Sequence, residues 1–312
     1  MSCLHIRDLS VRFPTAEGFV AAVNNVSFDH IGGETLALIG ETGCGKSVIA
    51  SAIMGLLPMN ARISGEILFG GRNLLEADRE LLDEIRGRDI AAVFQNPSLA
   101  LNPIQRIGKQ IAEPLIVHSG MPKKEALFAV RKVLLKLGFS DINEHLRAYP
   151  FQFSGGMNQR VLIAAAMVMN PKVLIADEPT KGLDMELRDE VMKEILFIKQ
   201  QNHSSLFLIT HDFEMARMTA DRIAVMYAGE IVEIARSGDF FQHPLHPYAQ
   251  ALEKSLPSNG FQPIPGNPPS GTEPPPGCKF HPRCPYAEEQ CRRENPPILE
   301  YNSRKVKCFL YA

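Results

Sequence analysis

Residues 40–47 read Gly40-Glu41-Thr42-Gly43-Cys44-Gly45-Lys46-Ser47, which fits the pattern G-x-x-x-x-G-K-[ST]. The stretch follows an apolar run at 36–39 that is typical of a strand, and it precedes a helical pattern at 48–57. In this context the glycines let backbone N–H groups converge on phosphates, and the start of the helix adds a partial positive charge. We therefore expect a nucleotide site in which Lys46 reaches the β and γ phosphates and Ser47 binds Mg²⁺. The alternative, a glycine-rich connection beside an ordinary helix, is disfavoured by the flanking elements.

Cys44 stands inside this loop, close to a helix N-terminus and to a lysine. Both neighbours favour the thiolate form of a cysteine. The sequence therefore predicts that an alkylating reagent inactivates the protein and that bound ATP protects it.

Two carboxylates end a second apolar run. Residues 173–176 are apolar and are followed directly by Asp177 and Glu178, which are poor core residues unless a cation binds there. Asp177 suits the Mg²⁺ shell, and Glu178 suits a base that polarises water. The alternative is a strand that runs out into a solvated acidic turn.

Three further signals are weak when each is taken alone. His211 follows an apolar run at 206–209, at the sheet edge where ligands gather, which favours a contact to the γ-phosphate. Gln95 follows the run 90–94, although an amide after a strand usually just ends it. A second anion site is possible before a helical pattern at 159–169, where a plain N-cap is the alternative. Its residues are Ser154-Gly155-Gly156-Met157-Asn158-Gln159.

The chain organisation indicates an α/β protein. Strand, helix and strand alternate over 173–209, which predicts parallel strands covered by helices, whereas the runs within 4–28 favour antiparallel pairing. Fourteen of the 23 prolines lie between Pro244 and Pro297, so a packed body should end near residue 240. We expect a body over 1–240 with a helical subdomain inserted at about 96–170. A Pro-rich linker over 241–277 and a four-cysteine segment over 278–312 would follow.

Composition excludes several classes of protein. Lys and Arg number 33 against 35 Asp and Glu, a formal net charge of −2, which does not fit a nucleic-acid binder driven by overall charge. No run approaches the roughly 18 apolar residues of a membrane-spanning helix, and the N-terminus lacks a secretion signal. We expect a cytosolic protein that neither crosses a membrane nor is secreted.

Four of the six cysteines fall in the last 35 residues, which indicates a local metal or cluster site: Cys278, Cys284, Cys291 and Cys308. No C-x2-C knuckle is present, which weakens a structural zinc interpretation. Thiolates around an iron–sulfur cluster would tie down a segment too small and too proline-rich to fold around its own core. Zinc, reduced cysteines and disulfides remain alternatives, and the net basic charge of the tail is typical of a solvated face.

Taken together, in this order and spacing, the motifs resemble an ABC-type ATPase over residues 1 to about 240. The resemblance implies a RecA-like mixed sheet core, an antiparallel β subdomain and an inserted helical subdomain. It also implies an ATP sandwich of two chains, in which the Ser154-Gly155-Gly156 signature of one chain closes on the γ-phosphate held by the other.

The same resemblance implies roles for single residues. Glu178 would be the general base, His211 the γ-phosphate sensor, and Gln95 a ligand that links Mg²⁺ and water to the helical subdomain. Asp184 would contact the second chain. Phe13 would stack on adenine, with a core strand residue as the alternative.

Narrower features resemble the D-type ATPase subunit of the oligopeptide, dipeptide and nickel importers. They are Phe94-Gln95-Asn96-Pro97, Leu101-Asn102-Pro103, the phenylalanine of Phe153-Ser154-Gly155-Gly156-Met157, His246-Pro247-Tyr248 and Pro274-Pro275-Pro276-Gly277-Cys278. The sequence departs from the usual family pattern at two places. Cys44 replaces the more usual serine or glycine, and Lys181-Gly182-Leu183-Asp184 replaces the commoner small residue followed by Ala-Leu-Asp. Neither departure removes a catalytic group. They leave the detailed geometry across the dimer open.

This narrower resemblance implies a [4Fe-4S] cluster on the four tail cysteines. It also implies a sister ATPase in a homo- or heterodimer, two membrane permease subunits and an extracytoplasmic substrate-binding protein, with no nucleic acid. The chain would sit peripherally on the cytoplasmic face of the inner membrane, with a peptide or a metal chelate such as nickel as cargo.

Two other functions compete with transport. A soluble ABC protein acting on nucleic acid or the ribosome would usually carry long coiled coils or two cassettes, whereas this sequence shows neither heptads nor a second phosphate loop. The cysteine tail could instead be a nucleic-acid or redox-sensing module that regulates the ATPase, which salt-dependent nucleic-acid binding would support.

Overall fold

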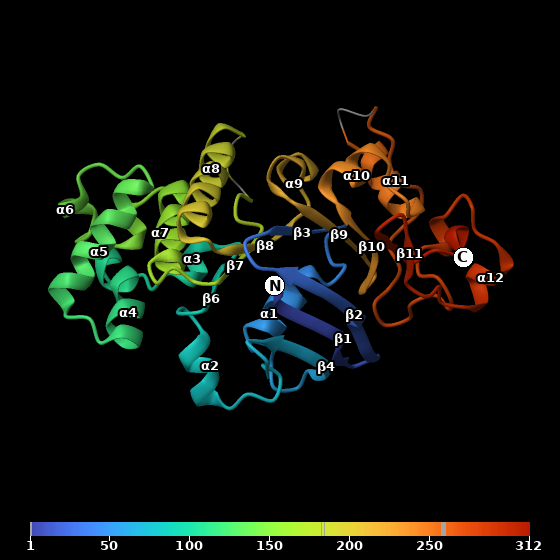
Figure 1. The fold of residues 1–312 in the computed structure, drawn as a ribbon, viewed down its shortest axis with the longest axis horizontal. Coiled ribbons are helices and arrows are strands. Elements are labelled where there is room, and N and C mark those ends of the chain that lie inside the picture. The colour runs from blue at the N-terminus through green and yellow to red at the C-terminus, as the bar shows by residue number, and fades with distance from the viewer. Residues whose placement is uncertain (1, 182, 184, 257–259) are drawn as a thin grey trace. The chain divides into compact units, whose positions relative to one another are not determined.

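The computed structural model describes residues 2–181, 183, 185–256 and 260–312 (Figure 1). The chain divides into two compact units. Unit 1 combines the chain up to Ala77 with Leu208–Ala312, and unit 2 is Asp78–Phe207.

Unit 1 contains an antiparallel sheet in the strand order β2-β1-β4-β5. Along β1, Leu4, Ile6, Leu9 and Val11 are fully buried while residues between them are partly exposed. This near-alternation is what a half-buried strand requires, and it confirms the antiparallel pairing expected for the N-terminal runs. The strands are β1 (Ser2–Thr15), β2 (Gly18–Ile31), β4 (Arg62–Phe69) and β5 (Arg72–Asn73).

A second, mixed sheet of unit 1 has the order β11-β12-β10-β9-β3. Strand β3 (Thr35–Ile39) is buried at every residue and pairs in parallel with β9 (Arg222–Tyr227). Continuous burial is typical of a parallel strand that is covered on both faces. Antiparallel partners follow in β10 (Glu230–Arg236), β12 (Arg304–Val306) and β11 (Leu299–Tyr301). The helices are α1 (Lys46–Ile53), α9 (Phe213–Thr219), α10 (Ser237–Gln242), α11 (Pro247–Lys254) and α12 (Glu289–Arg293).

Packed structure continues further along the chain than the sequence predicts. Helix α11 lies inside the 241–277 range that is predicted as a Pro-rich linker, and Tyr248 at its start is fully buried. The sequence does not indicate this helix, because a proline such as Pro247 usually breaks a helix. In the structure His246 caps the helix and Pro247 occupies its first turn, where a proline is well tolerated. The last segment also joins the core, since β12 hydrogen-bonds to β10.

Unit 2 combines a parallel strand pair with a set of helices. Strands β6 (Ile90–Val93) and β7 (Val173–Asp177) pair in parallel. Helix α5 buries Ala126, Val130 and Leu134, which form one stripe at helical spacing. The helices are α2 (Arg79–Ile85), α3 (Pro97–Ala100), α4 (Ile107–Ser119), α5 (Lys123–Lys136), α6 (Ile142–His145), α7 (Gly155–Met167) and α8 (Met185–Asn202).

Strand β8 (Ser205–Thr210) crosses from unit 2 into unit 1, where its last three residues lie beside β3. Within the described residues, single turns of 3₁₀ helix lie at Pro150–Gln152, His281–Arg283 and Phe309–Tyr311. Across the residues that the structure describes, no helix combines the length and the apolar character needed to cross a membrane.

Candidate nucleotide site and cysteine cavity

The predicted phosphate loop connects β3 to α1 in unit 1, as its sequence requires. Gly45 precedes the helix with a φ of 109°, a backbone conformation that favours glycine. A Cβ atom on Gly45 would lie 2.1 Å from the carbonyl oxygen of Ala22, and one on Gly40 would lie 2.2 Å from that of Met226. The loop therefore approaches β2 and β9 so closely that only glycine fits at these two positions.

Lys46 is held across its own loop. Its side chain is buried, with 6% of the residue exposed, and Nζ donates to the carbonyl oxygens of Gly40 (2.7 Å) and Glu41 (2.9 Å). Thr42, Gly43 and Ser47 are exposed, so the outer side of the loop is open to a ligand. Unit 1 thus places a cation and the start of a helix behind a loop with exposed residues, which is the arrangement that binds phosphate.

Cys44 does not behave as its sequence neighbours suggest. The residue is only 8% exposed, and burial raises the pKa of its thiol even though Lys46 Nζ lies 3.8 Å from Sγ. Desolvation disfavours the thiolate more than the nearby cation favours it. The prediction of a reactive thiolate at Cys44 is therefore wrong.

Glu41, the second residue of the loop, has partners that the sequence did not suggest. Its N–H donates to the hydroxyl oxygen of Tyr248 (2.9 Å), and its carboxylate accepts from both terminal nitrogens of Arg283. Both partners come from the C-terminal 70 residues, far from the loop in sequence. Motif patterns could not reveal them, because no local spacing connects position 41 with position 248 or 283.

In unit 2 the register of the parallel pair brings the predicted polar residues to one edge. Val93 of β6 pairs with Ala176 of β7, so Gln95 and Glu178 each stand two residues beyond paired positions. Asp177 is buried at the end of β7 and Gln95 is exposed. Glu178 adopts a φ of 48°, an uncommon conformation for a non-glycine residue that recurs at functional sites. Gln95 and Glu178 therefore follow the ends of two neighbouring parallel strands, and the roles of these residues stay predictions.

Ser154 caps helix α7, since its Oγ accepts from the N–H of Met157 at 3.3 Å. Ser154 and Gly155 are exposed, whereas Gly156 is buried so closely that a Cβ would lie 2.4 Å from Leu187. Gln159 is 3% exposed, which does not favour a direct contact with a bound nucleotide. The exposed end of the predicted signature is therefore its first two residues.

The remaining predicted residues are placed as follows. His211 is exposed and directly follows β8, whose end lies beside β3 in unit 1. Phe13 is half-buried in β1 opposite Val20. Asp184 lies outside the described residues. The functions assigned to all three stay predictions.

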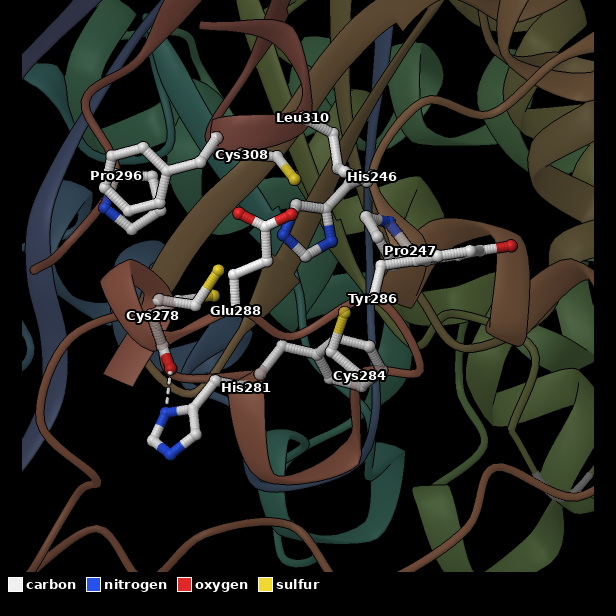
Figure 2. A pocket seen from close by; sticks show the side chains of 13 residues that line it. His246, Pro247, Cys278, His281, Cys284, Tyr286, Glu288, Pro296, Cys308 and Leu310 are labelled. Carbon is white, nitrogen blue, oxygen red and sulfur yellow. Dashed lines mark hydrogen bonds between the residues drawn. The ribbon is translucent and has the colours of Figure 1, made fainter. Parts of the chain in front are cut away.

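The four tail cysteines line a single cavity of about 180 Å³ in unit 1 (Figure 2). Figure 2 shows the sulfur atoms of Cys278, Cys284 and Cys308 and the carboxylate of Glu288 directed into the same space. Cys291 lines the cavity too, and its carbonyl oxygen accepts from the N–H of Cys278. Among the described residues, no three His, Cys, Asp or Glu side chains are grouped so as to hold one metal ion.

Burial controls the ionisation of these thiols. It raises the pKa of Cys308 to about 11, and it raises those of Cys278 and Cys284 above their ordinary value. Negative charge on the neighbouring thiols would raise the pKa of Cys278 and Cys308 further, because these thiols lie close enough to repel one another when ionised. Burial therefore favours the protonated thiols of Cys278, Cys284 and Cys308, and a bound metal would have to displace these protons.

The loop geometry and the mixed sheet define a phosphate-loop nucleotide-binding protein. Comparison with known proteins narrows this class. A family model described as ABC transporter matches residues 23–181, and one described as oligopeptide/dipeptide transporter, C-terminal region matches residues 232–291. The chain therefore belongs to the ABC transporter family, in its oligopeptide and dipeptide branch, and the predicted ABC-type ATPase is confirmed.

Individual relatives agree with this placement over nearly the whole chain. The dipeptide transport ATP-binding protein of Bacillus subtilis is 44% identical over 98% of this chain and 94% of the relative. The oligopeptide transport ATP-binding protein of Salmonella typhimurium is 40% identical over 98% of this chain and 93% of the relative. Among solved structures, a dimeric ATP-binding cassette in a post-hydrolysis state with ADP and Pi is 26% identical, with a TM-score of 0.67. It covers 75% of this chain and 98% of its own.

Proposed function

We propose that this chain is the ATP-hydrolysing subunit of an importer for dipeptides or oligopeptides. The observation that carries the proposal is the phosphate loop, packed against β2 and β9 through Gly45 and Gly40, in a chain whose relatives are named peptide transport ATP-binding proteins. A metal chelate such as nickel is the alternative cargo. The relatives named here support peptides.

Nucleotide binding rests on the residues of unit 1. The exposed N–H groups of the loop and the N-terminus of α1 would surround the β and γ phosphates. Lys46 would exchange its bonds to the two loop carbonyl oxygens for bonds to phosphate oxygens, which are stronger because both partners are charged. Ser47 would complete the Mg²⁺ shell with Asp177, and Phe13 would stack on the base.

Hydrolysis rests on the sheet edge of unit 2. Glu178 would orient and deprotonate the attacking water, and Gln95 would hold the same water and Mg²⁺ from the neighbouring strand. His211 would sense the γ-phosphate. Ser154 and Gly155, at the exposed start of α7, would close on the nucleotide of a second chain, with Asp184 at the same contact.

The assembly proposed from the family is an ATP sandwich with a sister or identical ATPase, on the cytoplasmic face of the inner membrane. Two membrane permease subunits and an extracytoplasmic substrate-binding protein would deliver and conduct the cargo. ATP binding would close the dimer, and hydrolysis would reopen it. The dimeric state of the cassette solved with ADP and Pi supports this proposal.

Two substitutions test the ATPase directly. Glu178→Gln should slow ATP hydrolysis by about 100-fold or more while ATP still binds, because the base is lost and the phosphate contacts remain. Lys46→Ala should weaken ATP binding itself. Glu84→Gln, an exposed carboxylate in α2, is the matched control and should leave both unchanged. Undiminished hydrolysis in Glu178→Gln would overturn the assignment of the base.

We propose further that the cysteine cavity holds a [4Fe-4S] cluster. The four thiols line one cavity, yet they are not grouped as a single ion would need, since zinc holds its sulfur ligands at about 2.3 Å. A four-iron cluster is wider and accepts thiolates that stand further apart. When bound, it would cross-link a segment that has little apolar core of its own.

Metal analysis tests this part of the proposal. Protein purified without oxygen should contain about four irons and four acid-labile sulfides per chain. Cys291→Ser should lose both, whereas Cys44→Ser should keep them because Cys44 lies in the phosphate loop. Stoichiometric zinc, or no metal, would overturn the cluster and leave the ATPase standing.

A further inference from the structure

The segment that carries the cysteines reaches the phosphate loop through one side chain. Arg283, which directly precedes Cys284, places Nη1 2.9 Å from Oε2 of Glu41 and Nη2 3.0 Å from Oε1. The arginine side chain is 4% exposed. A bidentate pair of this kind fixes orientation as well as distance, and little solvent competes for it.

The third nitrogen of this guanidinium is also bonded. Nε donates to the carbonyl oxygen of Pro265 at 2.9 Å, and Nη1 has a second acceptor in the hydroxyl of Tyr227 at 3.3 Å. The backbone of Arg283 is fixed in turn, since its N–H donates to the carbonyl oxygen of Phe280. Movement of the cysteine segment therefore cannot be absorbed by a free rotation of this side chain.

A second connection runs through the aromatic residues beside the cavity. His246 lines the cavity and accepts the N–H of Tyr248 at Nδ1, and the hydroxyl of Tyr248 accepts the N–H of Glu41. Phe280, another cavity residue, packs with its ring centroid 5.4 Å from that of Tyr248 and 5.2 Å from that of Tyr227. The backbone and the carboxylate of Glu41 are thus held by Tyr248 and Arg283, which contact or adjoin residues that line the cavity.

Glu41 in turn controls the position of Lys46, because its carbonyl oxygen is one of the two acceptors of Nζ. We propose that Arg283 is a positioning residue for the phosphate loop. We also propose that the presence or absence of a group bound by the cavity cysteines changes nucleotide affinity through the Arg283–Glu41 pair. This inference rests on the proposed nucleotide site. Linkage is reciprocal for equilibria, so a nucleotide on the loop must change the affinity of the cavity for a group that binds there by the same factor. We expect the exposure of the cavity thiols to change with it.

Nucleotide affinity provides the first test, on the full chain purified without oxygen. Arg283→Met should weaken ATP binding by about tenfold, a usual size for coupling between sites. Arg283→Lys should restore little, because an ammonium cannot reproduce the two parallel bonds. The matched control is Arg293→Met, which removes an exposed arginine of the same segment and should bind ATP as the wild type does. Wild-type affinity in Arg283→Met would overturn the inference.

Arg283→Met leaves the half-buried carboxylate of Glu41 without its cation, which costs folding stability. The double variant Glu41→Gln/Arg283→Met removes both charges, and it should fold and still bind ATP more weakly than the wild type. Thermal unfolding of each variant establishes that it is folded before affinity is compared. A folded double variant with wild-type affinity would also overturn the inference.

Thiol labelling provides the reciprocal test. In protein freed of metal with a chelator, MgADP should slow the modification of Cys284 in the wild type by about fivefold or more, read peptide by peptide so that Cys44 is counted separately. Arg283→Met should lose this protection, and Arg293→Met should keep it. Equal labelling rates with and without nucleotide, in a chain that binds ATP, would overturn the coupling alone. A wild-type chain that binds no ATP would overturn the proposed function and the coupling with it.

Discussion

Lys307 places Nζ 2.6 Å from Oε2 of Glu230, a carboxylate that is only 3% exposed. The other oxygen of Glu230 accepts from the side-chain amides of Asn24 (2.7 Å) and Asn295 (3.1 Å). Glu230 directly follows Gly229, whose N–H donates to the carbonyl oxygen of Cys44. The buried carboxylate of Glu230 therefore links Lys307 and Asn295 of the C-terminal segment to β2 and β10, which lie next to the phosphate loop.

Glu230→Ala should destabilise this attachment by about 3 kcal/mol, because it leaves the partly buried ammonium of Lys307 and two amides without their acceptor. Urea unfolding measures the loss, and limited proteolysis shows whether the C-terminal segment is cut first. Glu289→Ala removes the exposed partner of Arg293 and should cost less than about 1 kcal/mol. Equal stability of the two variants would show that the Glu230 network contributes nothing.

Gly45→Ala should abolish ATP binding even though it adds a single methyl group. The new Cβ would lie 2.1 Å from the carbonyl oxygen of Ala22, and the φ of 109° is unfavourable for alanine. Gly238→Ala is the matched control, because nothing lies within 4 Å of its Cβ position and its φ is not positive. Titration with a fluorescent ATP analogue compares the two. Retained affinity in Gly45→Ala would show that the loop can move away from β2.

Cys44 should react slowly with iodoacetamide at neutral pH. Burial keeps the thiol protonated and covered, so its rate should be well below that of a free cysteine in a denatured sample of the same protein. Peptide mapping by mass spectrometry gives the rate for this residue alone. Rapid modification of the folded chain would restore the thiolate prediction made from the sequence.

Local patterns predicted the elements and the sheet edges well. The register pairs Val93 with Ala176, and each of these two strands carries a predicted polar residue two positions further on, Gln95 and Glu178. Such features follow from strand period and chain direction, which a sequence displays directly. The glycine positions of the loop were predictable as well, because the motif G-x-x-x-x-G-K-[ST] specifies them.

Contacts between distant segments could not be predicted. The bonds of Glu41 to Arg283 and Tyr248 depend on where the C-terminal segment packs, and no periodic pattern encodes that. Cys44 shows the same limit for electrostatics. Its sequence neighbours favour a thiolate, but its ionisation is decided by burial against residues that come from other strands.

Glu194 of α8 gives unit 2 a pH-dependent stability. Burial raises the pKa of this carboxyl from 4.5 to about 7, against the attraction of Arg160, whose Nε lies 3.4 Å from Oε2. Between these two pH values the folded chain holds a proton that the unfolded chain releases. Its contribution to stability is therefore fully present below about pH 4.5 and is lost as the pH rises through about 7.

Glu194→Gln should remove this loss, because an amide does not titrate. Relative to the variant, the wild type should lose about 2 kcal/mol of unfolding free energy between pH 5 and pH 8, measured by urea unfolding at both values. Other titrating groups cancel in the comparison, since both proteins carry them. Glu84→Gln, at an exposed carboxylate of the same unit, should follow the wild type at each pH. A wild type that instead gained stability over the variant on going to pH 8 would mean that the attraction of Arg160 outweighs burial at Glu194.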